Sequence, residues 1–171
     1  GMNYLFTKKT AGFFLALLMT NGTAFSVKAA EALPLPDIDT SFKTYMDYRA
    51  ITDRSSAQYE LQQEAYTDSD GIRRVGDDVC IAVGSAYADN IGDRLEITLE
   101  SGSTFTAVVG DFKADRDTDS MHMYYPVCEG MGDVTEFIAD TSKLDRQVRV
   151  SGSIGSIEKY SGCISSIVPI E

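Results

Sequence analysis

The sequence is poor in the residues that most often carry metal and nucleophile chemistry, with three cysteines and one histidine among 171 residues. No pattern marks the single His122 as the partner of a cysteine, so a cysteine–histidine catalytic dyad is not predicted. No Cys-x-x-Cys pair occurs, so a zinc site is not predicted. We expect neither a metal nor a cofactor.

Basic residues are also scarce: 15 Lys and Arg stand against 26 Asp and Glu, which gives a formal net charge of −11. Lys8, Lys9 and Lys28 lie within residues 1–29, which hold no acidic residue, so the remainder carries about −14 (−11 − 3). A surface of this sign repels nucleic acid and anionic lipid, and both are excluded as expected partners. A neutral glycan or a cationic ligand remains open.

Long hydrophobic runs are missing as well. The run Ala11–Met19 is too short for a bilayer, which needs about 20 apolar residues. Lys8 and Lys9 precede it, and Val27-Lys-Ala29 offers small residues at the positions that a signal peptidase reads. Residues 1–29 are therefore predicted to be a signal peptide, and the mature protein to be secreted to the cell envelope or beyond. No cysteine follows the cleavage region, so no lipid anchor is expected.

The odd number of cysteines leaves one thiol over in any single bridge. Cys80 lies within an apolar strand and passes for a small buried hydrophobe. Cys128 and Cys163 stand beside Gly130 and Gly162, in turn-like contexts. They are the favoured pair if a bridge forms.

The order of patterns divides the remaining chain into three parts. Residues 30–39 form an extended linker, because each proline of Leu33-Pro-Leu-Pro36 disfavours helix in the residue before it. Residues 40–65 form a helical segment, with one helix over residues 42–50 and a second, capped by Ser55 or Ser56, through Ala65. Residues 66–171 form a β domain.

The β domain is predicted from short apolar runs separated by turn residues. Asp68-Ser-Asp-Gly71 forms a turn, and Leu99-Glu-Ser-Gly-Ser-Thr104 forms a hairpin with Gly102 as its turn residue. The expected strands are Val79–Val83, Arg94–Leu99, Thr104–Val109, Val134–Ala139, Val148–Val150 and Ile164–Ile170. Six short strands of this kind favour a small barrel.

Three runs give this domain a family resemblance: Cys80-Ile-Ala-Val-Gly-Ser-Ala-Tyr87, Ile91-Gly-Asp-Arg-Leu-Glu-Ile97, and Val108-Val-Gly-Asp111 with the later Asp119. Over about residues 66–170 they resemble the double-psi β-barrel, and within it the three-aspartate domain of bacterial cell-wall lytic enzymes. The resemblance implies a mainly β, six-stranded double-psi β-barrel preceded by a short helical segment. It also implies a peptidoglycan or other cell-wall glycan as partner.

The resemblance assigns roles to two aspartates. Asp111 matches the aspartate that is the catalytic acid and base in lytic transglycosylases of this type, and Asp119 matches the later aspartate of the motif. Two positions depart from the pattern: Gly84 stands where the first aspartate belongs, and Phe112-Lys113 replaces Thr-Gly. These departures leave three functions open, namely a lytic transglycosylase-like enzyme, a non-catalytic wall-binding module and a scaffold for a protein partner.

The chemistry of glycan cleavage suits a carboxyl group at position 111. An acid protonates the leaving glycosidic oxygen, and in the lytic reaction the same group then takes the proton of the attacking 6-hydroxyl. Aspartates of this kind also cap turns in acidic loops, and that simpler role for Asp111 stays open.

Other side chains are candidates for substrate binding by their chemistry. Polar and aromatic groups suited to sugars or peptides precede or follow the expected strands: Tyr66, Arg73, Lys113, His122 and Tyr124. The alternate spacing of Asp115, Asp117 and Asp119 imitates the opening of a calcium loop, but Ser120 and Pro126 stand where an EF-hand has Gly and Glu. The pattern therefore predicts no EF-hand, and a looser calcium site remains an alternative.

Overall fold

The computed structural model describes residues 30–171, and the expected signal peptide lies outside this range. The chain forms a mainly β structure built on one mixed sheet, with few helices. The strands of the sheet are β1 (Tyr45–Asp47), β2 (Tyr66–Thr67), β3 (Arg73–Val75), β4 (Asp78–Val83), β5 (Arg94–Leu99), β6 (Thr104–Phe112), β9 (Glu136–Ala139) and β10 (Ile164–Ile170). A separate hairpin pairs β7 (Tyr125–Cys128) with β8 (Met131–Asp133).

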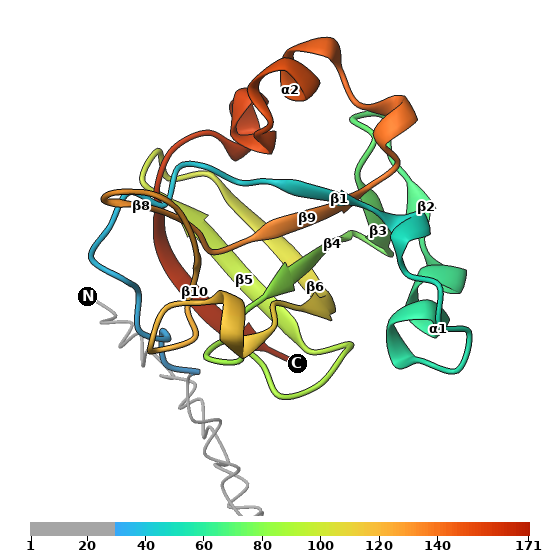
Figure 1. Ribbon diagram of the computed structural model, residues 1–171, viewed down its shortest axis with the longest axis horizontal. Coiled ribbons are helices and arrows are strands. Elements are labelled where there is room, and N and C mark those ends of the chain that lie inside the picture. Colours follow the sequence, from blue (N-terminus) through green and yellow to red (C-terminus); the bar gives the residue numbers. More distant parts are fainter. Residues whose placement is uncertain (1–29) are drawn as a thin grey trace, which may run out of the picture.

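The two α-helices are α1 (Ala57–Glu64) and α2 (Arg146–Ser151). Short 3₁₀ turns connect other elements: η1 (Tyr48–Ala50), η2 (Asp115–Asp117), η3 (Thr141–Lys143), η4 (Ile154–Ser156) and η5 (Glu158–Tyr160). In Figure 1 the strands twist around a shared interior, with α1 beside β2 and β3 and α2 beyond β9. No helix in the described range is long and apolar enough to cross a bilayer.

The principal path of the sheet runs β1-β9-β4-β6-β5-β10 and mixes two pairing directions. β1 with β9 and β4 with β6 are parallel pairs, whereas β4–β9, β6–β5 and β5–β10 are antiparallel. β4 lies at the centre and is buried along its whole length, because strands lie on both its edges and its two faces pack on separate apolar clusters. The sheet is not closed by a continuous ladder among these strands.

The core is assembled from the inward faces of the longer strands and an aromatic cluster. The rings of Phe105, Phe137 and Tyr160 pack with centroids 5.0 to 5.8 Å apart, two of the three pairs edge to face, which suits their quadrupoles. β5 alternates buried Leu95, Ile97 and Leu99 with more exposed residues. That alternation is typical of a strand with one face on the core.

Several expected elements are confirmed. Ser56 caps α1 by accepting the backbone N–H of Tyr59 at 3.1 Å, and Asp68–Gly71 turns with Gly71 at a φ of 85°. Gly102, at a φ of 89°, closes the hairpin between β5 and β6, a conformation that glycine adopts without steric cost. Five of the expected strands are also present, although β6 extends to Phe112 and the strand expected from Val134 begins at Glu136.

Two sequence predictions are wrong. Residues 42–50 do not form a helix: Tyr45–Asp47 pair in parallel with β9, and Asp47 then caps a 3₁₀ turn. Val148–Val150 do not form a strand, because Asp145 caps a helix there and Gly152, at a φ of 72°, ends it. In the first segment the pairing with β9, and in the second the helix caps, determined the secondary structure, whereas the pattern of apolar residues did not.

Candidate functional site

Two carboxylates flank the centre of the sheet, one on each neighbour of β4. Ala82 of β4 is in register with Asp111 of β6 and with Glu136 of β9. Residues in register on adjacent strands point to the same face, and only the small methyl group of the buried Ala82 lies between the two carboxylates. The structure thus brings Asp111 and Glu136 to the two sides of one small residue.

A β-bulge aims Asp111 at this face. Ile81 pairs with Val109 but Ala82 pairs with Asp111, so the register skips Gly110. A shift of one residue reverses the face on which a side chain lies, and without the bulge Asp111 would face the other side. A Cβ on Gly110 would lie 2.7 Å from Cδ1 of Ile138, so a larger residue here would require that side chain to move.

A buried ion pair lies beside the two carboxylates. Nζ of Lys113 is 3.2 Å from Oδ2 of Asp133, and the two side chains are 7% and 1% exposed. Burial raises the pKa of Asp133, and Lys113 offsets part of that rise. We call Asp111, Lys113, Asp133 and Glu136 the carboxylate cluster.

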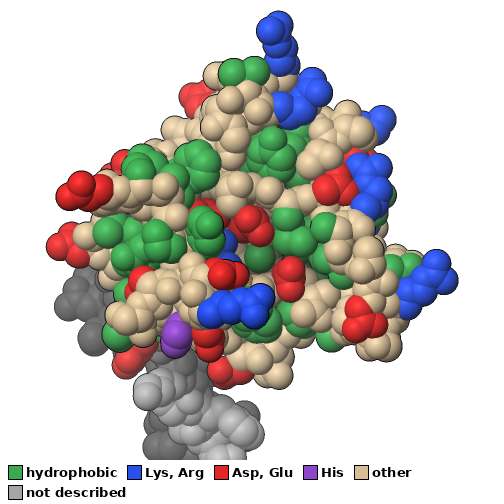
Figure 2. All heavy atoms as spheres, viewed as in Figure 1, with side chains coloured by type: hydrophobic (Ala, Val, Ile, Leu, Met, Phe, Trp, Pro, Cys, Tyr) green, Lys and Arg blue, Asp and Glu red, His purple; other side chains and the backbone are tan. Residues whose placement is uncertain are grey.

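The cluster favours the protonated form of Glu136. Burial is the largest cause that raises the pKa of this carboxyl, the charges of Asp133 and Asp111 raise it further, and Lys113 opposes them. Figure 2 shows acidic and basic side chains gathered near the centre of this face, with hydrophobic side chains on both sides. A carboxyl group whose pKa is raised in this way is suited to donate a proton in general acid catalysis.

Asp111 also opens toward a pocket of about 300 Å³. Its Oδ1 accepts the backbone N–H of Phe112 at 2.9 Å and is 3.4 Å from the amide Nε2 of Gln58, which donates from α1. The pocket is lined by Met46, Ala50, Ile51, Thr52, Asp53, Ser56, Gln58 and Asp111. A ligand in this pocket contacts Asp111 from the side of α1.

Asp119 is held by its own loop instead. Its carboxylate accepts the backbone N–H groups of Met121, Met123 and Tyr124 at 2.7 to 3.0 Å. Burial alone would raise the pKa of Asp119, but these three donors outweigh it and the pKa is lowered. The arrangement orders the 119–124 loop, and it does not place Asp119 within the carboxylate cluster.

His122 lies in the same loop with a strained backbone, at a φ of 58°. Its Nδ1 is 3.1 Å from Oγ1 of Thr118 and 3.6 Å from Oδ1 of Asp115, which also accepts a hydrogen bond from Ser85. The backbone carbonyl of His122 faces Gly84, where a Cβ would lie 2.0 Å from that oxygen. The position that the family motif gives to its first aspartate therefore has no room for a side chain.

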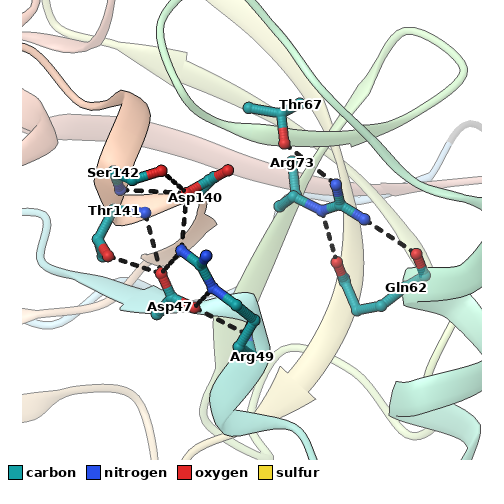
Figure 3. Close-up of polar contacts among 8 residues, drawn as sticks. All are labelled: Asp47, Arg49, Gln62, Thr67, Arg73, Asp140, Thr141 and Ser142. Atoms are coloured by element: carbon teal, nitrogen blue, oxygen red, sulfur yellow. Dashed lines mark hydrogen bonds and ion pairs between the residues drawn. The ribbon is translucent and has the colours of Figure 1, made fainter.

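The other expected binding residues lie apart from the cluster. Tyr66 is exposed and donates its hydroxyl to the carbonyl of Gly76, and Tyr124 packs against Gly132. Arg73 is buried and donates to Gln62, Thr67 and the carbonyl of Ala65, as Figure 3 shows for the first two. Of the expected binding residues only Lys113 belongs to the cluster, where it pairs with Asp133.

Cys80, Cys128 and Cys163 are all free, so the favoured bridge between the last two is not present in the structure. Burial raises the pKa of the Cys80 thiol to about 11, which makes it a poor nucleophile. Among residues 30–171 no group of three or more potential ligands is placed to hold a metal ion, and the loop with Asp115, Asp117 and Asp119 forms no such group.

A larger cavity, of about 520 Å³, lies near the start of β5 between Leu33 and Pro169. Asp93 lines it, but its Oδ2 accepts the backbone N–H groups of Asp89 and Asn90 at 3.0 Å each. These hydrogen bonds stabilise a turn and occupy the carboxylate of Asp93, so we prefer the carboxylate cluster as the candidate site.

Comparisons with known proteins find nothing similar. No protein-family model matches the chain, and no curated protein or solved structure gives a significant match.

Glu136 and Asp133 were missed by the sequence reasoning. Both lie in the run Asp133-Val-Thr-Glu-Phe-Ile-Ala139, which is otherwise nearly apolar. A charged residue inside such a run is buried or half-buried, and buried charges are seldom present without a partner or a function. The sequence contains this signal, but it does not show which strands lie beside the run.

Proposed function

We propose that this protein is an exported cell-envelope protein that cleaves the glycan of peptidoglycan, with Asp111 and Glu136 as its catalytic pair. The placement of these two carboxyl groups on either side of Ala82 is the observation that carries the proposal. Paired carboxyl groups with different protonation states are the usual machinery of glycosidic bond cleavage.

The two groups divide the steps of a lytic reaction. Glu136, whose pKa is raised, donates its proton to the leaving glycosidic oxygen. Asp111 accepts the proton of the sugar's 6-hydroxyl as that oxygen attacks the anomeric carbon, which closes the anhydro ring without water. Lys113 and Asp133 act on the pKa of Glu136 in opposite directions: Lys113 lowers it and Asp133 raises it.

A double-psi barrel is the proposed architecture of the β domain. Its support is the two parallel pairs in the sheet and the approach of the two edges of the sheet. The backbone N–H of Ile164 donates to Oγ1 of Thr40, and Lys43 of the segment before β1 donates its Nζ to the carbonyl of Gly162. These side-chain bonds join the chain before β1 to the start of β10.

The deciding experiment incubates purified protein with peptidoglycan and measures released anhydro-muropeptides. Asp111→Asn keeps the acceptor for the Phe112 N–H, and Glu136→Gln keeps the size of the side chain. Each is expected to lower release by on the order of 10²–10⁴, the usual worth of a general acid or base. Asp117→Asn, at a half-exposed carboxylate outside the cluster, is the matched control and keeps full activity. Unchanged release by Asp111→Asn contradicts the role of Asp111.

A wall-binding module without catalysis is the second candidate. Asp119 is engaged by backbone donors and Gly84 has no room for a side chain, so two of the three aspartate positions of the family motif are not available for chemistry. In this case the protein sediments with peptidoglycan but releases no muropeptide. The two measurements on one sample separate the candidates.

A further inference from the structure

Lys113 and Asp133 hold two reactive groups in contact inside the protein. Nζ of Lys113 lies 3.2 Å from Oδ2 of Asp133, and the two side chains are 7% and 1% exposed. Both residues are fixed by their neighbours: the backbone N–H of Lys113 donates to the carbonyl of Val83 at 2.9 Å, and Oδ1 of Asp133 accepts the backbone N–H of Thr44 at 3.3 Å. An amine and a carboxyl group held at this distance are the two halves of an amide bond.

Burial shifts this pair toward its neutral form, because a charge taken out of water loses its solvation. The raised pKa of Asp133 has burial as its largest cause. Transfer of one proton from Nζ to Oδ2 along the contact turns the ammonium into an amine and the carboxylate into a carboxylic acid. A desolvated lysine amine is a nucleophile, and a carboxylic acid is more easily attacked at its carbon than a carboxylate is.

Glu136 supplies a third group for proton transfer on the same face of the sheet. The bond from Lys113 to Val83 continues the pairing of β6 with β4 by one residue. Side chains two residues apart on a strand face the same side, so Lys113 follows Asp111 onto the face that Asp111 shares with Glu136. Burial raises the pKa of Glu136, so this carboxyl holds a proton that it can donate.

We propose that Lys113 and Asp133 condense to an intramolecular amide, which cross-links the chain directly after β6 to the end of β8. The bond between Nζ and Cγ forms, the bond between Cγ and Oδ2 breaks, and Oδ2 leaves as water. Glu136 protonates the departing hydroxyl and then takes a proton from Nζ, so it ends the reaction as it began. The reaction consumes no oxidant, because no atom changes its oxidation state.

The fixed positions of the two groups favour condensation over hydrolysis. Separate amines and acids in water do not condense to a useful extent. Two groups held in reacting geometry behave as if they were present at effective concentrations that reach about 10⁵–10⁸ M. A buried site also keeps water away from the amide once it has formed.

The amide closes a loop that runs from residue 113 to residue 133 and contains the loop of His122 and most of the β7–β8 hairpin. A link of this kind restricts the unfolded chain, as a disulfide does. Small secreted proteins often depend on disulfides, whereas all three cysteines of this protein are free. The amide gives the proposed exported protein a covalent link that does not depend on thiols.

Mass spectrometry tests the bond directly. Full-length folded protein is sampled over time, and we expect a fraction lighter than its sequence by the mass of one water, which grows until the reaction is complete. Trypsin then leaves peptides 95–116 and 117–143 joined, because it cleaves after Arg116 but not after an acylated Lys113.

A second Lys–Asp pair in the same protein is the internal control. Nζ of Lys159 lies only 2.7 Å from Oδ2 of Asp70, but these side chains are 53% and 28% exposed. We expect no amide between them, because water solvates both charges. An amide at this exposed pair as well would contradict the part that burial plays in the reaction.

Three variants test the roles of the groups. Lys113→Arg keeps the charge and removes the amine, so peptides 95–116 and 117–143 are expected to lack the link. Glu136→Gln is expected to slow the loss of water by on the order of 10²–10⁴, the usual worth of a general acid or base. Lys143→Arg, at an exposed position, is the matched control and leaves the rate unchanged.

Two results overturn the inference: a parent protein whose two peptides separate after prolonged incubation in the folded state, or a link that survives in Lys113→Arg. An unchanged rate in Glu136→Gln contradicts the role of Glu136 in proton transfer. Amide formation and muropeptide release are separate products, so the inference and the proposed function fail separately.

The ion pair is the state before this reaction, and the intact mass distinguishes the two states. Once the amide forms, Lys113 and Asp133 no longer act on Glu136 as charges, whereas its burial and the charge of Asp111 remain. The unreacted protein is therefore the reference for the stability of variants at positions 113, 133 and 136, since only this form carries both charges.

Discussion

At the scale of single residues, the side chain proposed as the general acid lowers the stability of the fold at neutral pH. Glu136 is half-buried among other charges, and burial raises its pKa, so the folded state prefers the protonated carboxyl. The unfolded chain loses this proton at lower pH than the fold does. The contribution of Glu136 to the free energy of unfolding therefore decreases as pH rises from the unfolded pKa through the folded one.

Glu136→Gln is expected to raise the free energy of unfolding at pH 7 and to flatten its dependence on pH, since glutamine imitates the protonated acid. The same change lowers muropeptide release. Urea unfolding between pH 4 and pH 8 measures the first effect, with Glu129→Gln, at an exposed position of the β7–β8 hairpin, as the control. A Glu136→Gln protein less stable than the parent at pH 7 would falsify this account.

Lys113, unlike Glu136, is expected to increase the free energy of unfolding at pH 7, because it pairs with the buried Asp133. Lys113→Met leaves Asp133 buried and charged, so it costs about 3–5 kcal/mol at pH 7. The loss shrinks in acid, because protonation removes the unpaired charge of Asp133, whose pKa is already raised by burial.

The double variant Lys113→Met, Asp133→Asn is the control for this pair. Asparagine keeps an acceptor for the backbone N–H of Thr44, so the double variant is expected to recover most of the lost stability. Urea unfolding of both variants at pH 4 and pH 7 checks these effects. A single variant as stable as the parent at both pH values contradicts the structural role of the pair.

At the scale of elements, the loop after β4 and the loop around His122 are expected to form one unit. Gly84 is the closest point of contact, because a Cβ there would lie 2.0 Å from the carbonyl oxygen of His122. Gly84→Ala forces two backbones apart, and we expect it to lower the free energy of unfolding by about 3 kcal/mol.

Ser85→Ala, one residue further along, tests whether the tight contact is the cause. It removes only the exposed hydrogen bond to Asp115 and is expected to cost less than about 1 kcal/mol. Thermal unfolding ranks the two variants, and similar losses for both would contradict the role of the tight contact.

The same scale shows which parts of the fold can be predicted from the sequence. β5, β6 and the hairpin between them are local, and alternation with one turn glycine was enough to place them. Residues 42–50 were misread because β1 owes its strand conformation to β9, about 90 residues away, and helical spacing carries no information about that partner. The caps Asp145 and Gly152 predict α2 from its two ends, whereas the valines between them favour a strand and led to the wrong prediction.

Of the proposed catalytic pair, only Asp111 was predicted from the sequence, and the reason is related. Asp111 lies near the end of a clearly apolar strand, and Gly110 beside it is the residue that the register skips at the bulge. Glu136 meets it only through the order β6-β4-β9, which depends on how three distant segments pair. Residue type therefore pointed to one carboxylate, and only topology supplies the second.

At the scale of the whole molecule, the net charge of the protein bears on the proposed attachment to a cell wall. The net charge is −11 for the whole chain and about −14 (−11 − 3) without residues 1–29, and it opposes approach to a wall that carries anionic phosphate polymers. Salt shortens the reach of this repulsion from about 30 Å at 0.01 M to about 8 Å at 0.15 M. Sedimentation with such walls is therefore expected to increase over this range of ionic strength. Walls stripped of their anionic polymers should bind nearly equally at both, which is the control. Binding that instead falls steeply with salt would show that local ion pairs, and not the net charge, govern attachment.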